Sequence, residues 1–303
     1  GTTKDTNTYV EMAKKRGAHT MAILNKRNGD ISYIVDDVLY LGNGRDVEIA
    51  VPSTKTYHCH LILGYIFTLY IISKISNDLN KIKKKLNEVL KVSKIISLIL
   101  KKKKTENHDN LYKKFSNSNN WYCLYDGQSK KYASMEIRIK LSECCYKTIP
   151  YMDVKNFIKN EIENSLIVYD VGLETNKLEY VIKQVIKKKN YVILIGDEKK
   201  LEKIKKNKYI YKISYPLTLK DFSIIFSVLS GQILSFNVAK FLDRRGNFFK
   251  KFSKDILKNK KTRAIKKFLS RKYDKAFLVN YSKNEILTLK NNMRKIFPKR
   301  NSK

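Results

Sequence analysis

The chain has 303 residues, and its hydrophobic fraction of 43% excludes disorder throughout and allows one large or two medium domains. Its formal net charge of +35 invites a nucleic-acid interpretation, yet 10 of the 63 basic residues are Arg and the rest are Lys. Arg reads phosphates and base edges better than Lys does. An A/T-biased genome would enrich Lys, Asn, Ile and Tyr without any such selection, so we predict no nucleic-acid partner.

The cysteines and the apolar runs indicate a cellular compartment. Cys144 and Cys145 are adjacent, which suits a reducing compartment better than a disulfide framework. No secretory signal is visible at the start, and the apolar run LILGYIFTLYII at 61–72 is short for a membrane span and suits a buried helix. The HCH triplet at 58–60 lacks a second ligand pair at a zinc-like spacing. We expect a cytoplasmic protein without metal, cofactor or membrane partner.

The first quarter of the chain predicts alternating helices and strands. GTTKDT is a Gly/Thr-rich turn before a helix at 6–16, an arrangement in which the free N–H groups of the first helical turn face an anion. Apolar runs at 19–25 and 33–42 have the character of buried strands. The segment STKTYHCH then gives a cap signal for a long apolar helix that ends near 75. This alternation favours a parallel α/β sheet.

Residues 77–120 predict a helical, Lys-rich linker, with an apolar stripe that begins at Leu79. The α/β rhythm then returns, with strand-like runs at 121–127, 164–172, 191–197 and 209–216, and long helices at 129–147 and 218–242. A weak internal repeat aligns ETNKLEYVIKQVIKKKNYVILIGDE, from Glu174, with DTNTYVEMAKKRGAHTMAILNKR, from Asp5. Two copies of one α/β domain are the simplest account of it.

Two segments carry a family resemblance. GTTKDT resembles the end of the Ser-Gln-Ser-Gly-Glu-Thr-x-Asp-Thr phosphate loop of sugar isomerase (SIS) domains. VEIAVPSTKTYHCH resembles the Glu-Ile-Gly-Val-Ala-Ser-Thr-Lys-Ala-Phe-Thr segment of the isomerase half of glutamine–fructose-6-phosphate aminotransferases. More weakly, KYASMEIRIKLSECCY resembles the helix of the family's isomerisation base, and VLSGQILSFNVAKFLDRRGNFFKKFSKDIL resembles its final helix and C-terminal tail.

The resemblance implies an α/β fold of two SIS-type, flavodoxin-like lobes with parallel sheets, the first incomplete, joined by a helical linker. Residues 1–76 would be the C-terminal portion of the first SIS domain and 77–120 the linker. Residues 121–258 would be a second, divergent SIS domain with the catalytic tail, and 259–303 a basic extension. The resemblance also implies a fragment of a longer protein with an upstream glutaminase domain, and a homodimer.

Several substrate-binding residues follow from the resemblance. Gly1, Thr2 and Thr3 stand in the loop that grips the phosphate of fructose 6-phosphate in the family. A plain helix cap is the alternative role of Thr3. Val51 and Ser53 match the segment that contacts the sugar, and Ser53 also suits a helix cap.

The catalytic assignments concern one helix and the tail. By the resemblance, Glu143 matches the family's isomerisation base. Moving a proton between C1 and C2 of an open-chain sugar needs a carboxylate within reach, and Glu143 would supply it. Glu136, Lys140 and Glu143 stand at i, i+4 and i+7 and share a helix face, with a surface salt-bridge ladder as the alternative. Lys254, preceded by Ser253, matches the tail lysine that polarises the sugar carbonyl or forms a Schiff base.

Two departures from the family pattern leave alternatives open. The family's Gly-Glu-Leu-Lys-His-Gly-Pro, whose His assists ring opening, is replaced by DVKNFIKNEIEN, and Ser142 replaces a Lys beside Glu143. We rank first an aminotransferase that makes glucosamine 6-phosphate from fructose 6-phosphate and glutamine-derived ammonia. A non-catalytic SIS protein that binds sugar phosphates comes second. A basic module that binds RNA or a membrane surface comes third.

Overall fold

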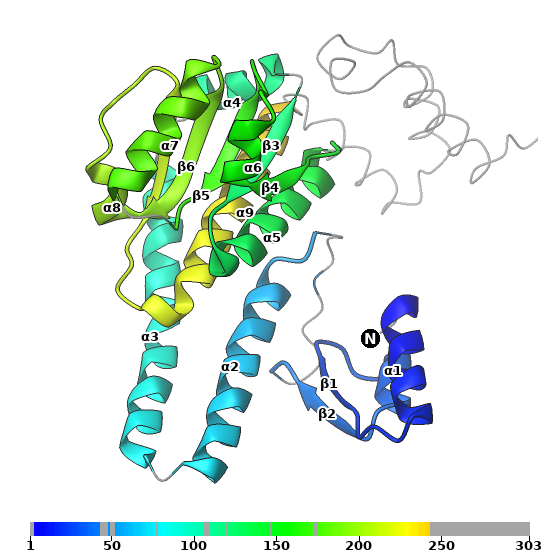
Figure 1. The fold of residues 1–303 in the computed structure, drawn as a ribbon. Helices are drawn as coiled ribbons and strands as arrows, with labels where there is room; N and C mark the ends of the chain where they lie inside the picture. Colours follow the sequence, from blue (N-terminus) through cyan, green and yellow to red (C-terminus); the bar gives the residue numbers. More distant parts are fainter. Residues whose placement is uncertain are drawn as a thin grey trace, which may run out of the picture. The chain divides into compact units, whose positions relative to one another are not determined.

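The computed structural model describes residues 3–42, 48, 52–76, 78–105, 109–118, 120–145, 147–172 and 175–242 (Figure 1). The chain divides into two compact units. Unit 1 comprises residues 1–98 with 219–225, and unit 2 comprises 99–218 with 226–303. The division falls inside one long helix, α3 (Leu79–Thr105).

The start of unit 1 is a small α/β layer. Helix α1 (Lys4–Lys15) is followed by β1 (Met21–Leu24), the 3-10 turn η1 (Asp30–Tyr33) and β2 (Asp37–Tyr40). Strands β1 and β2 pair in parallel, and Ala22, Leu24 and Ile31 form a small core beneath them. Gly17, just after α1, has a φ of +79°, which a residue without a Cβ adopts at no steric cost. The predicted helix and two strands are confirmed here.

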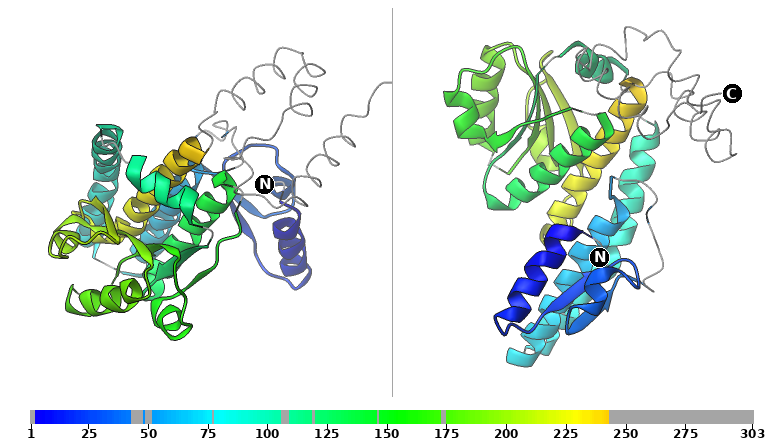
Figure 2. Two further views of the ribbon diagram at one scale, coloured as in Figure 1. Left: turned by 90° about the horizontal axis from the view of Figure 1, so that it is seen from above. Right: turned by 90° about the vertical axis from the view of Figure 1, so that its right-hand side faces the viewer.

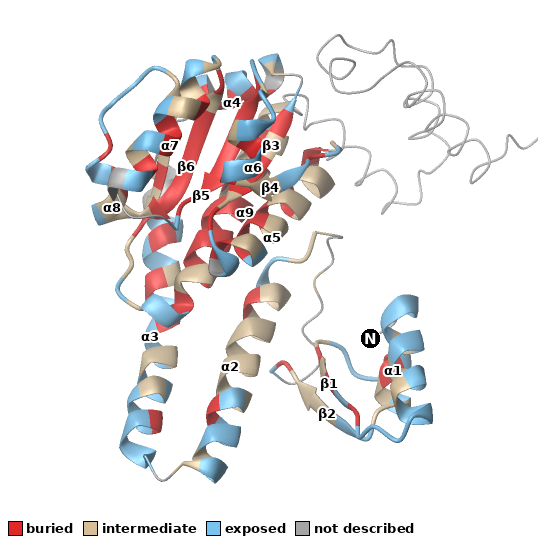
Figure 3. Ribbon diagram, in the orientation of Figure 1, coloured by how far each residue is buried: buried red, intermediate tan, exposed pale blue. Residues whose placement is uncertain are grey.

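Helix α2 (Lys55–Ile75) follows as predicted, but the expectation that it is buried is wrong within unit 1. The buried residues of this helix are His58 and Leu69 (Figure 3). The burial is this limited because the two described strands of unit 1 offer too little apolar surface to cover so apolar a helix. By length and composition, α2 and the segment Lys220–Leu242 could each cross a membrane, with 11% and 67% of the apolar window buried. Core helices of soluble proteins satisfy the same criterion.

A polar clamp joins residues 219–225 to the helices of unit 1. The short turn η2 (Lys220–Phe222) carries Asp221, whose Oδ2 accepts from Tyr65 Oη at 2.9 Å and from Lys85 Nζ at 2.7 Å. The ring of Phe222 packs edge-on against Tyr65, with 4.9 Å between the ring centroids. This clamp explains why the segment belongs with α2 and α3 although it is remote in sequence.

The described strands of unit 2 form one five-stranded parallel sheet in the order β4-β3-β5-β6-β7. Every residue of β5 is buried, as expected for a parallel strand covered on both faces. From β3 the chain adds β4 on one side and then β5, β6 and β7 on the other, so the strand order reverses direction between β3 and β5. The strands are β3 (Trp121–Tyr125), β4 (Tyr151–Asp153), β5 (Leu166–Asp170), β6 (Tyr191–Asp197) and β7 (Ile210–Tyr215).

Helices cover both faces of this sheet (Figures 1 and 2). One face packs on α6 (Val154–Lys159), α7 (Thr175–Lys187) and α8 (Glu198–Glu202), and the other on α5 (Gln128–Cys145) and α9 (Ser223–Leu242). Helix α4 (Asp109–Asn117) precedes β3. Helices α5 and α9 approach closely, since a Cβ added at Gly231 would lie 2.3 Å from Ile137 Cγ1.

The main helices and strands expected from the sequence of unit 2 are confirmed, but two short elements were missed. The predicted runs correspond to β3, β5, β6 and β7, and the predicted helices to α5 and α9. Both copies of the internal repeat form a helix followed by a parallel strand, α1 with β1 and α7 with β6. The short elements β4 and α6 were not predicted. The α/β class with parallel sheets is confirmed.

Candidate functional site

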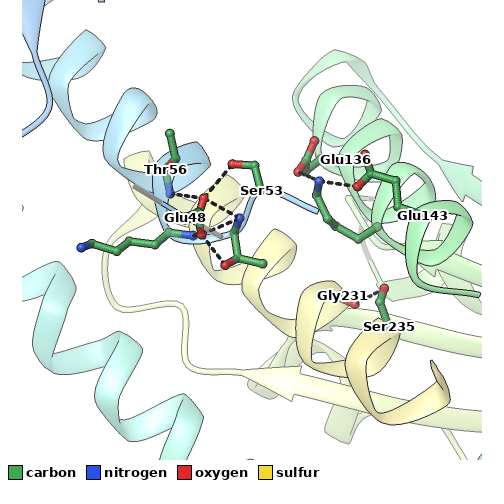
Figure 4. A network of polar contacts seen from close by, with 10 residues as sticks. Glu48, Ser53, Thr56, Glu136, Glu143, Gly231 and Ser235 are labelled. Atoms are coloured by element: carbon green, nitrogen blue, oxygen red, sulfur yellow. Dashed lines mark hydrogen bonds and ion pairs between the residues drawn. The ribbon is translucent and has the colours of Figure 1, made fainter. Parts of the chain in front are cut away.

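A buried lysine stands between two glutamates on α5. Lys140 Nζ lies 2.8 Å from Glu143 Oε2 and 3.3 Å from Glu136 Oε1 (Figure 4). Lys140 is 4% exposed, whereas a surface salt-bridge ladder would leave the lysine in water. The three residues that the sequence placed on one helix face are therefore brought together, and their shared ammonium group is inside the protein.

The apolar face of α5 holds this cluster in place. Ala133, Ile137 and Leu141 are buried at i, i+4 and i+8, and Lys140 borders this stripe. Burial raises the pKa of Glu136, and the charge of Lys140 partly opposes that effect. The Glu143 side chain keeps 32% exposure, so its carboxylate is open to a ligand. A carboxylate that is partly exposed and held in one position by an ion pair has the geometry that a general base needs.

A second polar cluster lies in unit 1, at the start of α2. The carboxylate of Glu48 accepts a hydrogen bond from Ser53 Oγ at 3.0 Å and others from the residues that begin the helix (Figure 4). Ser53 is half-buried, so its hydroxyl both supports this turn and remains within reach of solvent. Sequence reasoning missed Glu48, although a carboxylate five residues before a Ser-Thr-Lys-Thr helix start was the available signal.

Of the remaining predicted site residues, Thr3 lies within the described part of the chain. Thr3 is exposed and stands at the N-cap of α1, where its hydroxyl makes no capping hydrogen bond and its carbonyl oxygen accepts from the Asn7 amide at 3.1 Å. Its predicted contact with phosphate stays a prediction. The other five lie outside the described residues, and they are Gly1, Thr2, Val51, Ser253 and Lys254.

A buried ion pair, which the sequence did not suggest, lies at the carboxyl edge of the sheet in unit 2. Lys130 Nζ, in the first turn of α5, is 3.1 Å from Asp170 Oδ1 at the end of β5 and 3.0 Å from Tyr215 Oη. Ser227 Oγ of α9 donates to the same Asp170 oxygen at 2.6 Å. Burial raises the pKa of Asp170, and the charge of Lys130 opposes that effect. The signal was a single Asp at the end of the apolar run LIVYD.

This network fills the place where a doubly wound sheet takes a ligand, beyond the carboxyl ends of the strands beside the reversal of winding. A Cβ added at Gly172 would lie 2.2 Å from Asp126 Oδ1, so the loops after β3 and β5 are in contact. The buried Tyr169 hydroxyl donates to Asp126. The chain's own side chains occupy this part of unit 2, whereas Glu143 on α5 keeps a partly exposed side chain.

The segment DVKNFIKNEIEN at 153–164 has a packing role. The Asp153 carboxylate accepts from the Lys155 amide and caps α6, whose Val154 and Phe157 are buried in the core. The described residues of unit 2 contain no histidine. Among all described residues, no group of three or more His, Cys, Asp or Glu could hold a metal ion.

Comparison with curated proteins finds similarity to aminotransferases. Over 258 residues, or 79% of its length, the chain is 27% identical to the glutamine–fructose-6-phosphate aminotransferase of Caldanaerobacter subterraneus, of which it covers 39%. Over 81 residues, or 27% of its length, it is 42% identical to that of Clostridium tetani, of which it covers 13%. The chain thus spans well under half the length of these relatives. No protein-family model matches it.

Solved structures give the fold. The C-terminal domain of glucosamine-fructose-6-phosphate aminotransferase from Francisella tularensis matches with a TM-score of 0.69 at 21% identity, over 79% of this chain and 68% of that one. A putative phosphosugar isomerase from Clostridium difficile 630 matches with a TM-score of 0.60 at 18% identity, over 78% and 66%. The chain therefore has the α/β fold with parallel sheets of SIS domains.

Proposed function

We propose that this chain is the isomerase part of a glutamine–fructose-6-phosphate aminotransferase, which converts fructose 6-phosphate and glutamine-derived ammonia to glucosamine 6-phosphate. The observation that carries the proposal is the buried Lys140 between Glu136 and Glu143, the last with its carboxylate open to a ligand. The similarity to aminotransferases over 79% of the chain supports the same conclusion. An upstream glutaminase domain and a homodimer belong to this proposal.

In the proposed reaction, ammonia condenses with the C2 carbonyl of the open-chain sugar and releases water. Glu143 then removes a proton from C1 and returns it to C2, while the proton of the C1 hydroxyl passes to the imine nitrogen, which gives the 2-amino sugar with an aldehyde at C1. Such a positioned base contributes about 10²- to 10⁴-fold to a rate. Lys140 fixes the Glu143 carboxylate through their 2.8 Å ion pair.

The proposal also assigns the substrate-binding roles. Gly1, Thr2 and Thr3 bind the phosphate, and Val51 and Ser53 face the sugar. From the tail, Ser253 and Lys254 reach the sugar carbonyl. Glu136 pairs with Lys140 and is the last of the proposed substrate-binding residues.

One observation favours a second candidate, a non-catalytic protein that binds sugar phosphates. Where the family has its ring-opening histidine, this chain has α6, whose Val154 and Phe157 are committed to the core. Without that histidine, turnover depends on the open-chain sugar that forms in solution. The two candidates differ in whether a bound sugar phosphate exchanges its C1 proton.

The experiment follows fructose 6-phosphate in D₂O by proton NMR with wild-type protein, Glu143→Gln and Glu161→Gln. The proposal predicts loss of the C1 proton signal with wild-type protein and a reduction of about 10²-fold or more with Glu143→Gln. Glu161 is 87% exposed, so Glu161→Gln is the matched control and exchanges like wild type. Binding without exchange in the wild type would support the non-catalytic candidate, and exchange by Glu143→Gln at the wild-type rate would refute the role of Glu143.

A further inference from the structure

The ring of His60 joins helix α2 to strand β1 inside unit 1. Its Nδ1 lies 2.8 Å from the carbonyl oxygen of Thr56, one turn earlier in α2, and its Nε2 lies 3.1 Å from the carbonyl oxygen of Ile23 in β1. The carbonyl of Leu24 accepts from the amide of Leu41, just after β2, so the carbonyl of the preceding residue, Ile23, points to the other edge of β1. Among the described residues β1 pairs with β2 alone, and the imidazole supplies a partner for this edge carbonyl.

The two contacts of the ring depend on its charge. A backbone carbonyl oxygen only accepts hydrogen bonds, and a neutral imidazole carries a single N–H. The neutral ring can therefore donate to one of these carbonyls and turns a nitrogen lone pair toward the other. The imidazolium ion carries two N–H groups and donates to both. His60 is thus held at both ends as a cation and at one end as a neutral ring, whichever nitrogen keeps the proton.

Charges of both signs belong to the segments that the ring joins. Glu48 Oε2 accepts from the Thr56 amide at 3.1 Å, and the carbonyl of Thr56 accepts from His60. Burial raises the pKa of Glu48, but hydrogen bonds from Thr54 and Thr56 outweigh it and lower this pKa to about 2, so the carboxylate is ionised near neutral pH and favours the imidazolium. Strand β1, with the sequence MAIL, has no ionisable side chain. The other ionisable groups lie at the start of α2 and just after β1, where the Lys and Arg cations favour the neutral ring, and they are Lys55, Tyr57, His58, Cys59, Lys26 and Arg27.

We propose that His60 is a pH-dependent latch, which holds α2 on β1 through both ring nitrogens as the imidazolium and loses one of the two hydrogen bonds when the ring loses a proton. Histidine ordinarily changes charge between about pH 5 and 8, so the latch operates near neutral pH and is closed on the acid side. A hydrogen bond from a charged donor changes an opening equilibrium about ten- to hundredfold. The latch thus sets how often the first half of α2 detaches from β1. It stands on these contacts and is independent of the proposed function.

Hydrogen exchange of the backbone amides measures the latch. In the 303-residue chain, protection of residues 57–64, corrected for the intrinsic pH dependence of exchange, is expected to fall about ten- to hundredfold between about pH 5.5 and 8.5. His60→Gln carries no titratable group, so its protection should vary little over this range. His19→Gln is the matched control, because the His19 side chain in the same unit is 73% exposed, and it should keep the wild-type pH dependence. If the pH dependence persists in His60→Gln, another group such as His58 causes it and the latch is overturned.

Nitrogen NMR of the His60 ring gives a second readout on the wild-type protein. Long-range proton–nitrogen spectra distinguish the two protonated nitrogens of an imidazolium from the protonated and the bare nitrogen of a neutral ring. The latch predicts that protection of residues 57–64 falls over the same pH interval in which the ring loses one of its two protons. A ring that loses this proton while protection stays constant would overturn the inference. Failure of the chain to bind fructose 6-phosphate would refute the proposed function and leave the latch intact.

Discussion

The buried pair of Lys130 and Asp170 gives the sharpest stability prediction. Their side chains are 10% and 1% exposed, and the atoms Lys130 Nζ and Asp170 Oδ1 are 3.1 Å apart. Lys130→Met keeps most of the side-chain volume and removes the charge, which leaves the Asp170 carboxylate buried without its cation. Breaking a buried ion pair in this way costs about 3–5 kcal/mol, because the desolvated partner is no longer compensated.

The matched control is the same substitution at an exposed pair. Lys188 Nζ lies 3.7 Å from Glu161 Oε1, and these side chains are 26% and 87% exposed. An exposed pair of this kind contributes about 0–1 kcal/mol, so Lys188→Met should change the free energy of unfolding little. Urea unfolding can be followed by the fluorescence of Trp121, the single tryptophan, which is 3% exposed in β3 of unit 2.

A double substitution tests whether the stability lost in Lys130→Met comes from the uncompensated charge of Asp170. Lys130→Met with Asp170→Asn removes both charges, so it should cost less than the sum of the single changes, by about 1–3 kcal/mol. A loss for Lys130→Met within about 1 kcal/mol of that for Lys188→Met would refute the reasoning, because the pair would then behave like an exposed one. Strict additivity in the double variant would do the same.

Two further predictions concern helix packing and acid stability. Gly231→Ala should destabilise the protein by about 1–3 kcal/mol, since its Cβ would meet Ile137, while Gly64→Ala, where nothing lies within 4 Å, should stabilise α2 by about 0.5–1 kcal/mol. Equal melting temperatures for the two variants would contradict this. The pKa of Glu48 is lowered from 4.5 to about 2, so its stabilisation is complete above pH 4.5 and is lost as the pH falls towards 2. Glu48→Gln should flatten that part of the acid-unfolding curve, and superimposable curves would count against it.

The alternation of apolar runs was enough to predict the α/β class, because parallel strands buried on both faces read as unbroken apolar segments. LIVYD and YVILIGD are such segments, and they form β5 and β6. The short elements β4 and α6 carry too few residues to show a period. Helix α2 is as apolar as a core helix, yet its burial depends on what packs against it, which its own composition does not reveal.

The candidate site was predictable where its residues share one helix. Glu136, Lys140 and Glu143 are neighbours by helical spacing alone, but the burial of Lys140 follows from the packing of α5 on the sheet. Lys130 and Asp170 are 40 residues apart and meet because β3 and β5 are adjacent strands. Such a contact depends on strand order, which local periodicity does not encode.

The most direct test of the central claim is the formation of glucosamine 6-phosphate from fructose 6-phosphate and ammonium chloride. Mass spectrometry of the product distinguishes the amino sugar from its precursor. Wild-type protein is expected to form it, and Glu143→Gln is expected to form it at least about 10²-fold more slowly. A wild-type protein that binds fructose 6-phosphate and yields no amino sugar, or a Glu143→Gln variant that yields it at the wild-type rate, would contradict the account.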